Sequence, residues 1–224
     1  MLALAVFLIA GLPLLVAGEI GPKTKENPSA AGSVRESIDF LRREPTLLSI
    51  TGASIILAGV DSAWFVLLVA LVDVRLGYGA TAFGLLLAVG AAGGLVGAWL
   101  AGSGRGWPLE KVTAAVFGSM SGSLLLLGLA PSIVVTAMVL VLTSGGFALW
   151  NVFTVSARQR LTPQNLWGRV GAIYRTVVVT AALLGALLGG LIAAAASIEA
   201  TLVGGAALLL ISGSATVRQL RAIA

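Results

Sequence analysis

The chain contains neither cysteine nor histidine, and it has few charged residues. Of its 224 residues 10% are charged, whereas ordinary soluble domains carry about a quarter. The lack of cysteine excludes disulfides and thiolate metal sites. The lack of histidine removes the commonest general base and metal ligand. So few charges cannot surround a water-soluble core, and the composition therefore places the chain in a lipid bilayer.

The residues that are present argue against several other function classes. We expect no enzyme activity, metal site or cofactor, because no two carboxylates are placed to meet inside the apolar segments. The net charge of +5 does not indicate a nucleic-acid binder, since the basic residues fall between apolar segments. The glycine-rich stretch GAAGGLVG (90–97) is not followed by the GK[ST] of a nucleotide loop, which argues against ATP-driven transport.

Long apolar segments dominate the rest of the sequence. A transmembrane helix needs about 20 mainly apolar residues. The segments that approach this length are 2–18, 47–72, 80–101, 112–130, 133–156, 170–196 and 200–217. The first is short, and a signal peptide is the alternative, although its start lacks the basic residues of such peptides. We therefore predict an all-α integral membrane protein with about seven transmembrane helices.

The basic residues predict how these helices are oriented. If the first helix runs from outside to inside, Arg75 is the one basic residue outside and the other thirteen of the fourteen lie inside. Basic residues concentrate in cytoplasmic loops. We therefore expect a multi-pass protein of the cell membrane with its N-terminus outside and its C-terminus in the cytoplasm.

The longest connection divides the chain into unequal parts. Residues 1–18 form the first predicted helix, 19–45 a cytoplasmic linker, and 46–224 a bundle of six transmembrane helices. Within the linker, Ser33 and Glu36 have the spacing of a capping box, which predicts a short amphipathic helix beginning at Ser33. Pro45 ends this segment, and we expect the short helix to lie on the inner membrane surface.

Three stretches of sequence resemble a known family. They are GYGATAFGLLLAVGAAGGLVGAWLAGSGRG (77–106) with the loop GSGRGWPLEK (102–111), RQRLTPQNLWGRVGAIYR (158–175), and GALLGG (185–190). They resemble the major facilitator superfamily of secondary transporters, in particular its drug- and siderophore-exporter branch of enterobactin exporters and macrolide-efflux permeases. In this resemblance residues 1–18 correspond to the family's sixth helix and 46–224 to its C-terminal half.

The resemblance implies export of a small molecule, driven by protons and without a cofactor. It also implies that the family's first five helices are missing, so we expect a fragment, a truncated product, or a half that pairs with a separate N-terminal half or with itself. The expected partners are the lipid bilayer, the small-molecule substrate and H+. The alternatives are a non-transporting membrane subunit and a seven-helix receptor-like protein.

Asp61 is the one carboxylate deep inside a predicted transmembrane segment. Burying such a group without a partner costs at least about 2.5–3.5 kcal/mol. We therefore predict that Asp61 couples transport to protons and lies in a substrate cavity with Ser54, Trp64 and Asn151. The alternative is structural, with Asp61 in an interhelical hydrogen bond and Asn151 as a polar contact between helices.

The arginines near 158–175 surround a predicted helix start. Thr162 is a candidate N-cap and Pro163 suits the first helical position. Anchoring to the inner membrane surface explains arginines in any inside loop. Their placement around a helix start favours in addition a cytoplasmic gate, for which the candidates are Arg105, Arg158, Arg169 and Arg175.

Small residues and tryptophans complete the pattern. Pairs spaced as GxxxG and a stripe of alanine and glycine predict close helix packing. They are Gly90–Gly94, Gly93–Gly97, Gly118–Gly122 and the stripe Ala182, Gly185, Ala186, Gly189 and Ala193. Trp99, Trp107, Trp150 and Trp167 lie near the inner helix ends and are expected to anchor at the membrane interface.

Overall fold

The computed structural model describes residues 30–104 and 106–223. The predicted helix 2–18, the first part of the linker and the gate candidate Arg105 lie outside the described residues. The described chain begins with a short helix, α2 (Ala30–Arg43). This helix starts three residues before Ser33, so the prediction of a cap at Ser33 is wrong. Ala30 and Ala31 have the highest helix propensity of any residue type, which favours the earlier start.

Six long helices follow, and each is long and apolar enough to cross a membrane. They are α3 (Pro45–Ala70), α4 (Ala80–Ser103), α5 (Leu109–Leu129), α6 (Ile133–Leu161), α7 (Trp167–Ala195) and α8 (Ile198–Ile223). A π-helical turn, η1 (Leu71–Arg75), extends α3, and a 3-10 turn, η2 (Gln164–Leu166), precedes α7. This confirms an all-α membrane protein with a six-helix bundle.

Two of these helices are longer than predicted at the same end of the bundle. α6 continues to Leu161 instead of 156, and α8 continues to Ile223 instead of 217. The added residues include Arg, Gln and Leu, which are good helix formers although several of them are too polar for a membrane segment. Hydropathy detects the apolar part of a helix, whereas the backbone hydrogen bonds continue into the polar part.

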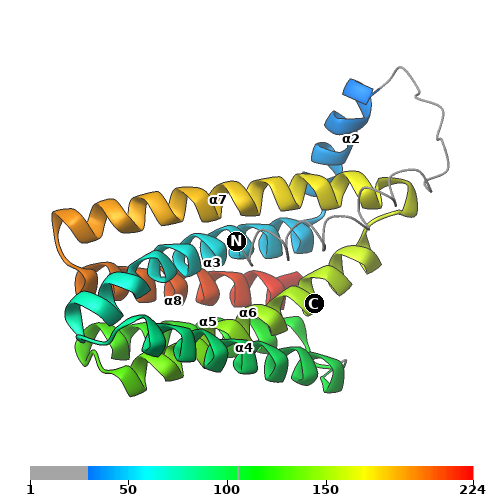
Figure 1. Ribbon diagram of the computed structural model, residues 1–224. Coiled ribbons are helices and arrows are strands. Elements are labelled where there is room, and N and C mark those ends of the chain that lie inside the picture. Colours follow the sequence, from blue (N-terminus) through cyan, green and yellow to red (C-terminus); the bar gives the residue numbers. More distant parts are fainter. Residues whose placement is uncertain (1–29, 105, 224) are drawn as a thin grey trace, which may run out of the picture. The chain divides into compact units, whose positions relative to one another are not determined.

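The helices pack in pairs that are not neighbours in the chain. α4 packs mainly on α6, α3 on α7, and α5 on α8, and contacts of α5 with α6 and of α3 with α8 join the pairs. Figure 1 shows α7 and α4 on opposite sides of the bundle. The helices α6 and α7 are consecutive in the chain, but α6 packs along α4 and α7 packs along α3. They therefore diverge from each other along their length.

The two ends of the bundle differ in charge. At one end the Ser49 hydroxyl donates a hydrogen bond of 3.0 Å to Oε1 of Gln219, which joins the start of α3 to the end of α8. This end, which we call the basic end, carries Lys111, Arg158, Arg160, Arg169, Arg175, Arg218 and Arg221. At the opposite end Arg75 pairs with Glu199 at 3.2 Å, which joins η1 to the start of α8.

Glycines allow the paired helices to approach closely. A Cβ on Gly97 would collide with the backbone of Gly145, and one on Gly185 with the backbone of Gly59. The predictions of close packing around Gly97 and Gly185 are therefore correct. The prediction for Gly118 and Gly122 is wrong, because a Cβ on either has no neighbour within 4 Å.

The core lies between α3, α5, α6 and α8. Its largest fully buried side chains include Phe117, Met120, Leu57 and Leu209. Trp150 packs edge-to-face on Phe117, with the ring centroids 5.3 Å apart, and is 2% exposed. The prediction that Trp150 is an interfacial anchor is therefore wrong. Its place in the helix near the basic end resembles that of an anchor, but its side chain points into the core.

Candidate functional site

Ser54 joins three helices near the centre of the bundle. It lies on α3 and is 3% exposed. The indole N–H of Trp150 on α6 donates to the Ser54 hydroxyl oxygen at 2.9 Å, and the Tyr174 hydroxyl on α7 lies 2.8 Å from the same oxygen. The Ser54 hydroxyl in turn donates to the Ile50 carbonyl at 2.7 Å. Protein groups therefore use the hydrogen-bonding capacity of the Ser54 hydroxyl. Ser54 positions Trp150 and Tyr174, and it does not line the cavities described below.

Asp61 lies two turns further along α3, in a cavity of about 390 Å³. Residues of α3 and α6 line this cavity, among them Trp64, Thr143 and Asn151. The indole N–H of Trp64 donates to Oδ1 of Asp61 at 3.2 Å. This bond lies within one helix, because Trp64 is three residues after Asp61. Among the described residues no ion pair involves Asp61, so its carboxyl group faces a cavity with a single neutral donor.

A second and larger cavity, of about 800 Å³, lies between α6 and α7 at the basic end. We call it the basic cavity. Polar side chains line it, namely those of Asn151, Arg158, Gln159, Thr162, Tyr174, Arg175 and Thr176. The guanidinium carbon of Arg158 lies 3.4 Å from the centroid of the Tyr174 ring. A guanidinium over an aromatic face is stabilised by a cation–π interaction, which holds Arg158 against α7.

Asn151 lines both cavities. It is exposed on α6, about two turns before Arg158. The two cavities therefore follow one face of the bundle, from Asp61 in the middle of α3 to the arginines at the basic end. This face results from the separation of α6 and α7, which leaves part of α3 uncovered between them.

The connection from α6 to α7 differs from the prediction. Thr162 ends α6 instead of capping α7, and α7 starts at Trp167 after the 3-10 turn. The indole N–H of Trp167 donates to the Thr162 carbonyl at 2.6 Å and closes this turn. Pro163 restricts the preceding residue to extended backbone, which explains why Thr162 terminates a helix.

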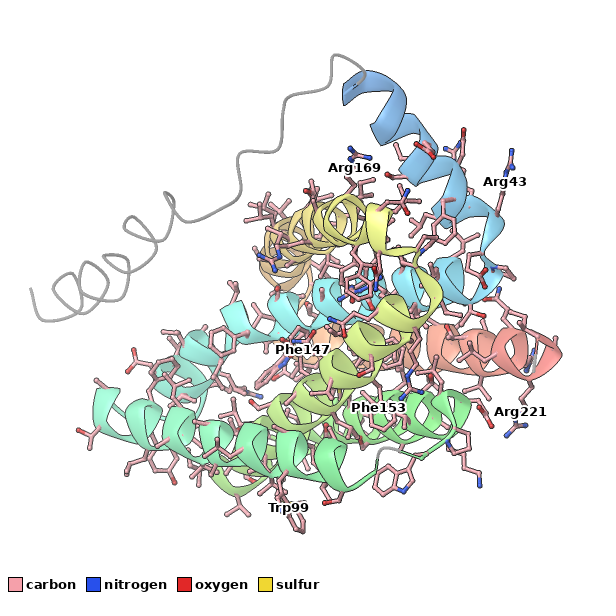
Figure 2. All side chains as sticks on the ribbon, turned by 90° about the vertical axis from the view of Figure 1, so that its right-hand side faces the viewer. Arg43, Trp99, Phe147, Phe153, Arg169 and Arg221 are labelled. Atoms are coloured by element: carbon pink, nitrogen blue, oxygen red, sulfur yellow. The ribbon has the colours of Figure 1, made fainter. Side chains whose placement is uncertain are left out.

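The structure brings together only some of the predicted site residues. Asp61, Trp64 and Asn151 share the smaller cavity, whereas Ser54 is buried and does not line it. Two of the gate candidates, Arg158 and Arg175, line the basic cavity. Arg169 does not line it, and Figure 2 shows its side chain pointing away from the bundle.

Sequence reasoning missed Tyr174 and misassigned Trp150 and Thr162. Tyr174 lies sixteen residues after Arg158 in the chain, so their stacking depends on the angle of the connection between the two helices. One signal was available for Tyr174. A tyrosine within an apolar helix needs a hydrogen-bond partner for its hydroxyl group.

The comparison with protein families agrees with this architecture. A family described as transmembrane secretion effector matches residues 19–223. The match includes all six long helices and the connections between them. Neither the comparison with curated proteins nor the comparison with solved structures gave a match.

Proposed function

We propose, since this chain belongs to the transmembrane secretion effector family of the major facilitator superfamily, that it exports a small molecule in exchange for protons. The family supports transmembrane transport in general. The proposal adds the direction, the coupling ion and the residues. The substrate is of drug or siderophore type, and it passes along the face formed by α3, α6 and α7.

The observation that carries the proposal is the environment of Asp61. Its carboxyl group lies in a transmembrane helix, beside a cavity, and hydrogen bonds only with Trp64 among the described residues. A structural aspartate in a membrane is normally paired with a base or a polar group of another helix. An aspartate that faces a cavity without such a partner can exchange a proton when the cavity opens to water.

The size of the two cavities supports a small-molecule substrate. Their volumes, about 390 and 800 Å³, lie in the range of ligand pockets, roughly 300–1,000 Å³. Transporters of this architecture bind substrate at the interface of two structural repeats. We therefore propose that a second six-helix half covers the face of α3, α6 and α7. Alternating access then follows from rocking of the two halves around Asp61 and Asn151.

The role of Asp61 is tested by the substitution Asp61→Asn. The amide keeps the shape and the hydrogen bond to Trp64 but cannot exchange a proton. We expect proton-driven transport of a fluorescent drug substrate into inside-out membrane vesicles to fall to background. The vesicles contain the chain assembled with its second half, and membrane insertion of the variant is checked by its abundance.

Asp73→Asn provides the matched control. Asp73 is an exposed carboxylate in η1 at the opposite end of the bundle. It undergoes the same chemical change, and transport is expected to continue at the rate of the unmodified protein. Unchanged proton-driven transport by Asp61→Asn would exclude Asp61 as the coupling group.

A further inference from the structure

Two buried polar atoms beside the basic cavity have no hydrogen-bond partner. They are Nη1 of Arg158 and Oγ1 of Thr162. Among the described residues, these two are the buried side-chain atoms without a hydrogen-bond partner. Thr162 is 6% exposed, so water at the surface does not satisfy its hydroxyl group. Buried polar groups are nearly always paired, and an unpaired one costs more when it is charged. Both atoms belong to residues that line one cavity, and a ligand that accepts hydrogen bonds would pair with them.

The charges around the cavity show what kind of ligand fits. Arg158 and Arg175 both line it, and no aspartate or glutamate does so among the residues that the structure describes. Arg158 is also fixed in place, because its guanidinium lies on the Tyr174 ring and Tyr174 is hydrogen-bonded to Ser54. A guanidinium held in one position is suited to bind carboxylate or phosphate through parallel hydrogen bonds.

We propose that the basic cavity binds an oxyanion, a carboxylate or phosphate group, between Arg158 and Thr162. Nη1 of Arg158 and the Thr162 hydroxyl donate to the oxyanion, and Arg175 adds a second positive charge. The less polar part of the bound molecule lies against Val155 of α6 and Val178 and Val179 of α7, which also line the cavity. If the oxyanion belongs to the transported molecule, the substrate is an organic anion, and this extension rests on the proposed function. The other source of the same group is the phosphate of an anionic lipid.

Binding is measured on the assembled protein in nanodiscs of phosphatidylcholine, which carries no net charge. The probes are phenyl phosphate and benzoate, with benzamide as the neutral control. Trp167 lines the cavity, so its fluorescence reports occupancy, and the midpoint of thermal unfolding provides a second readout. We expect both anions to change the fluorescence and raise the midpoint, and benzamide to change neither.

Three variants identify the atoms that bind the anion. Arg158→Gln is expected to weaken phenyl phosphate binding roughly 10- to 100-fold, as expected for a hydrogen bond to a charged group. Thr162→Val, which keeps the side-chain shape, is expected to weaken it about three- to tenfold. Arg160→Gln is the matched control, because Arg160 is an exposed arginine of the same helix that does not line the cavity. It is expected to bind like the unmodified protein.

The source of the oxyanion is decided by adding phosphatidylglycerol to the nanodiscs. If the lipid competes with phenyl phosphate only when Arg158 is present, the natural oxyanion is a lipid headgroup. If phenyl phosphate binds equally well with the lipid present, it is a solute. Binding of phenyl phosphate that is unaffected by Arg158→Gln and Thr162→Val would overturn the oxyanion site. No binding at all would also overturn it.

The oxyanion experiment does not depend on proton coupling. Binding to the basic cavity can be present when Asp61→Asn leaves transport unchanged, and that result would reject the proposed coupling alone. Absence of binding together with loss of transport in Asp61→Asn would reject the oxyanion site alone.

Discussion

Ser54 shows how a single small side chain can hold several helices together in a membrane. Its hydroxyl oxygen on α3 accepts hydrogen bonds from Trp150 of α6 and Tyr174 of α7 at once. Polar side chains in membrane bundles form hydrogen bonds between helices. Here the shared serine also positions Tyr174 beneath Arg158, so a structural hydrogen bond supports the geometry of the basic cavity.

Ser54→Ala is therefore expected to lower the free energy of unfolding by about 1–3 kcal/mol. The buried Trp150 N–H loses its acceptor, and the Tyr174 hydroxyl loses its partner on α3. Unfolding in mixed detergent micelles, followed by circular dichroism, measures the change.

Ser103→Ala is the control for this substitution. The Ser103 hydroxyl donates only to the Trp99 carbonyl of its own helix, and Ser103 is exposed. Its removal is expected to have little effect. An equal loss of stability in the two variants would contradict the role of Ser54 as a link between helices.

At the scale of elements, the bundle is built from pairs of helices that meet at small residues. α4 and α6 meet at Gly97 and Gly145, and α3 and α7 meet at Gly59 and Gly185. The backbones approach closely there because no Cβ lies between them, which increases dispersion contacts. Because α4 packs along α6 and α7 packs along α3, this arrangement also separates α6 from α7. The separation opens the face that carries the two cavities.

Gly97→Ala is expected to destabilise the bundle by about 1–3 kcal/mol, as overpacking does. The added methyl group would meet the Gly145 backbone, and α4 and α6 would have to move apart. The midpoint of thermal unfolding in detergent measures the effect.

Gly118→Ala is the matched change at a glycine with open space around it. It is expected to be neutral or to stabilise α5 by up to about 1 kcal/mol, because alanine has the higher helix propensity. Similar destabilisation by both substitutions would show that helix packing is not the cause.

The sequence predicted the positions of these helices better than their contacts, because apolar length and glycine spacing carry different information. The six long helices were predictable because their apolar segments are long and are separated by short polar connections. The packing glycines were not distinguishable by spacing alone, since Gly93–Gly97 and Gly118–Gly122 have the same pattern. Which glycine meets another helix depends on how each helix is rotated about its axis. Polar residues at the helix ends also extended α6 and α8 beyond their apolar segments.

At the scale of the whole molecule, the multi-pass arrangement places nearly all described basic residues at one end of the bundle. Arg75 is the exception, and it is paired with Glu199 at the opposite end. Figure 2 shows Arg221 at the end of α8 and Trp99 projecting from the outer side of α4. Positive charges favour the cytoplasmic side of a membrane. The basic end, and with it the mouth of the basic cavity, is therefore expected to face the cytoplasm.

The absence of cysteine makes this orientation directly testable. Val74→Cys introduces one thiol in η1 at the opposite end, where Val74 is 82% exposed. Gly106→Cys introduces one in the exposed connection between α4 and α5 at the basic end. A membrane-impermeant maleimide is expected to label Val74→Cys in intact cells and Gly106→Cys only after permeabilisation. The opposite pattern would reverse the orientation.

The sequence by itself determined the class of the protein and the approximate positions of the six long helices that the structure describes, because burial in lipid demands apolar segments of a definite length. It also singled out Asp61, since a carboxylate in such a segment is costly and therefore conspicuous. Only the tertiary structure decided which polar groups meet. It buried Ser54 and Trp150 in one hydrogen-bonded group and placed Arg158 on Tyr174. It also left the side-chain hydroxyl of Thr162 without a hydrogen-bond partner. These contacts depend on helix rotation and on the turn at Pro163, which apolar periodicity does not encode.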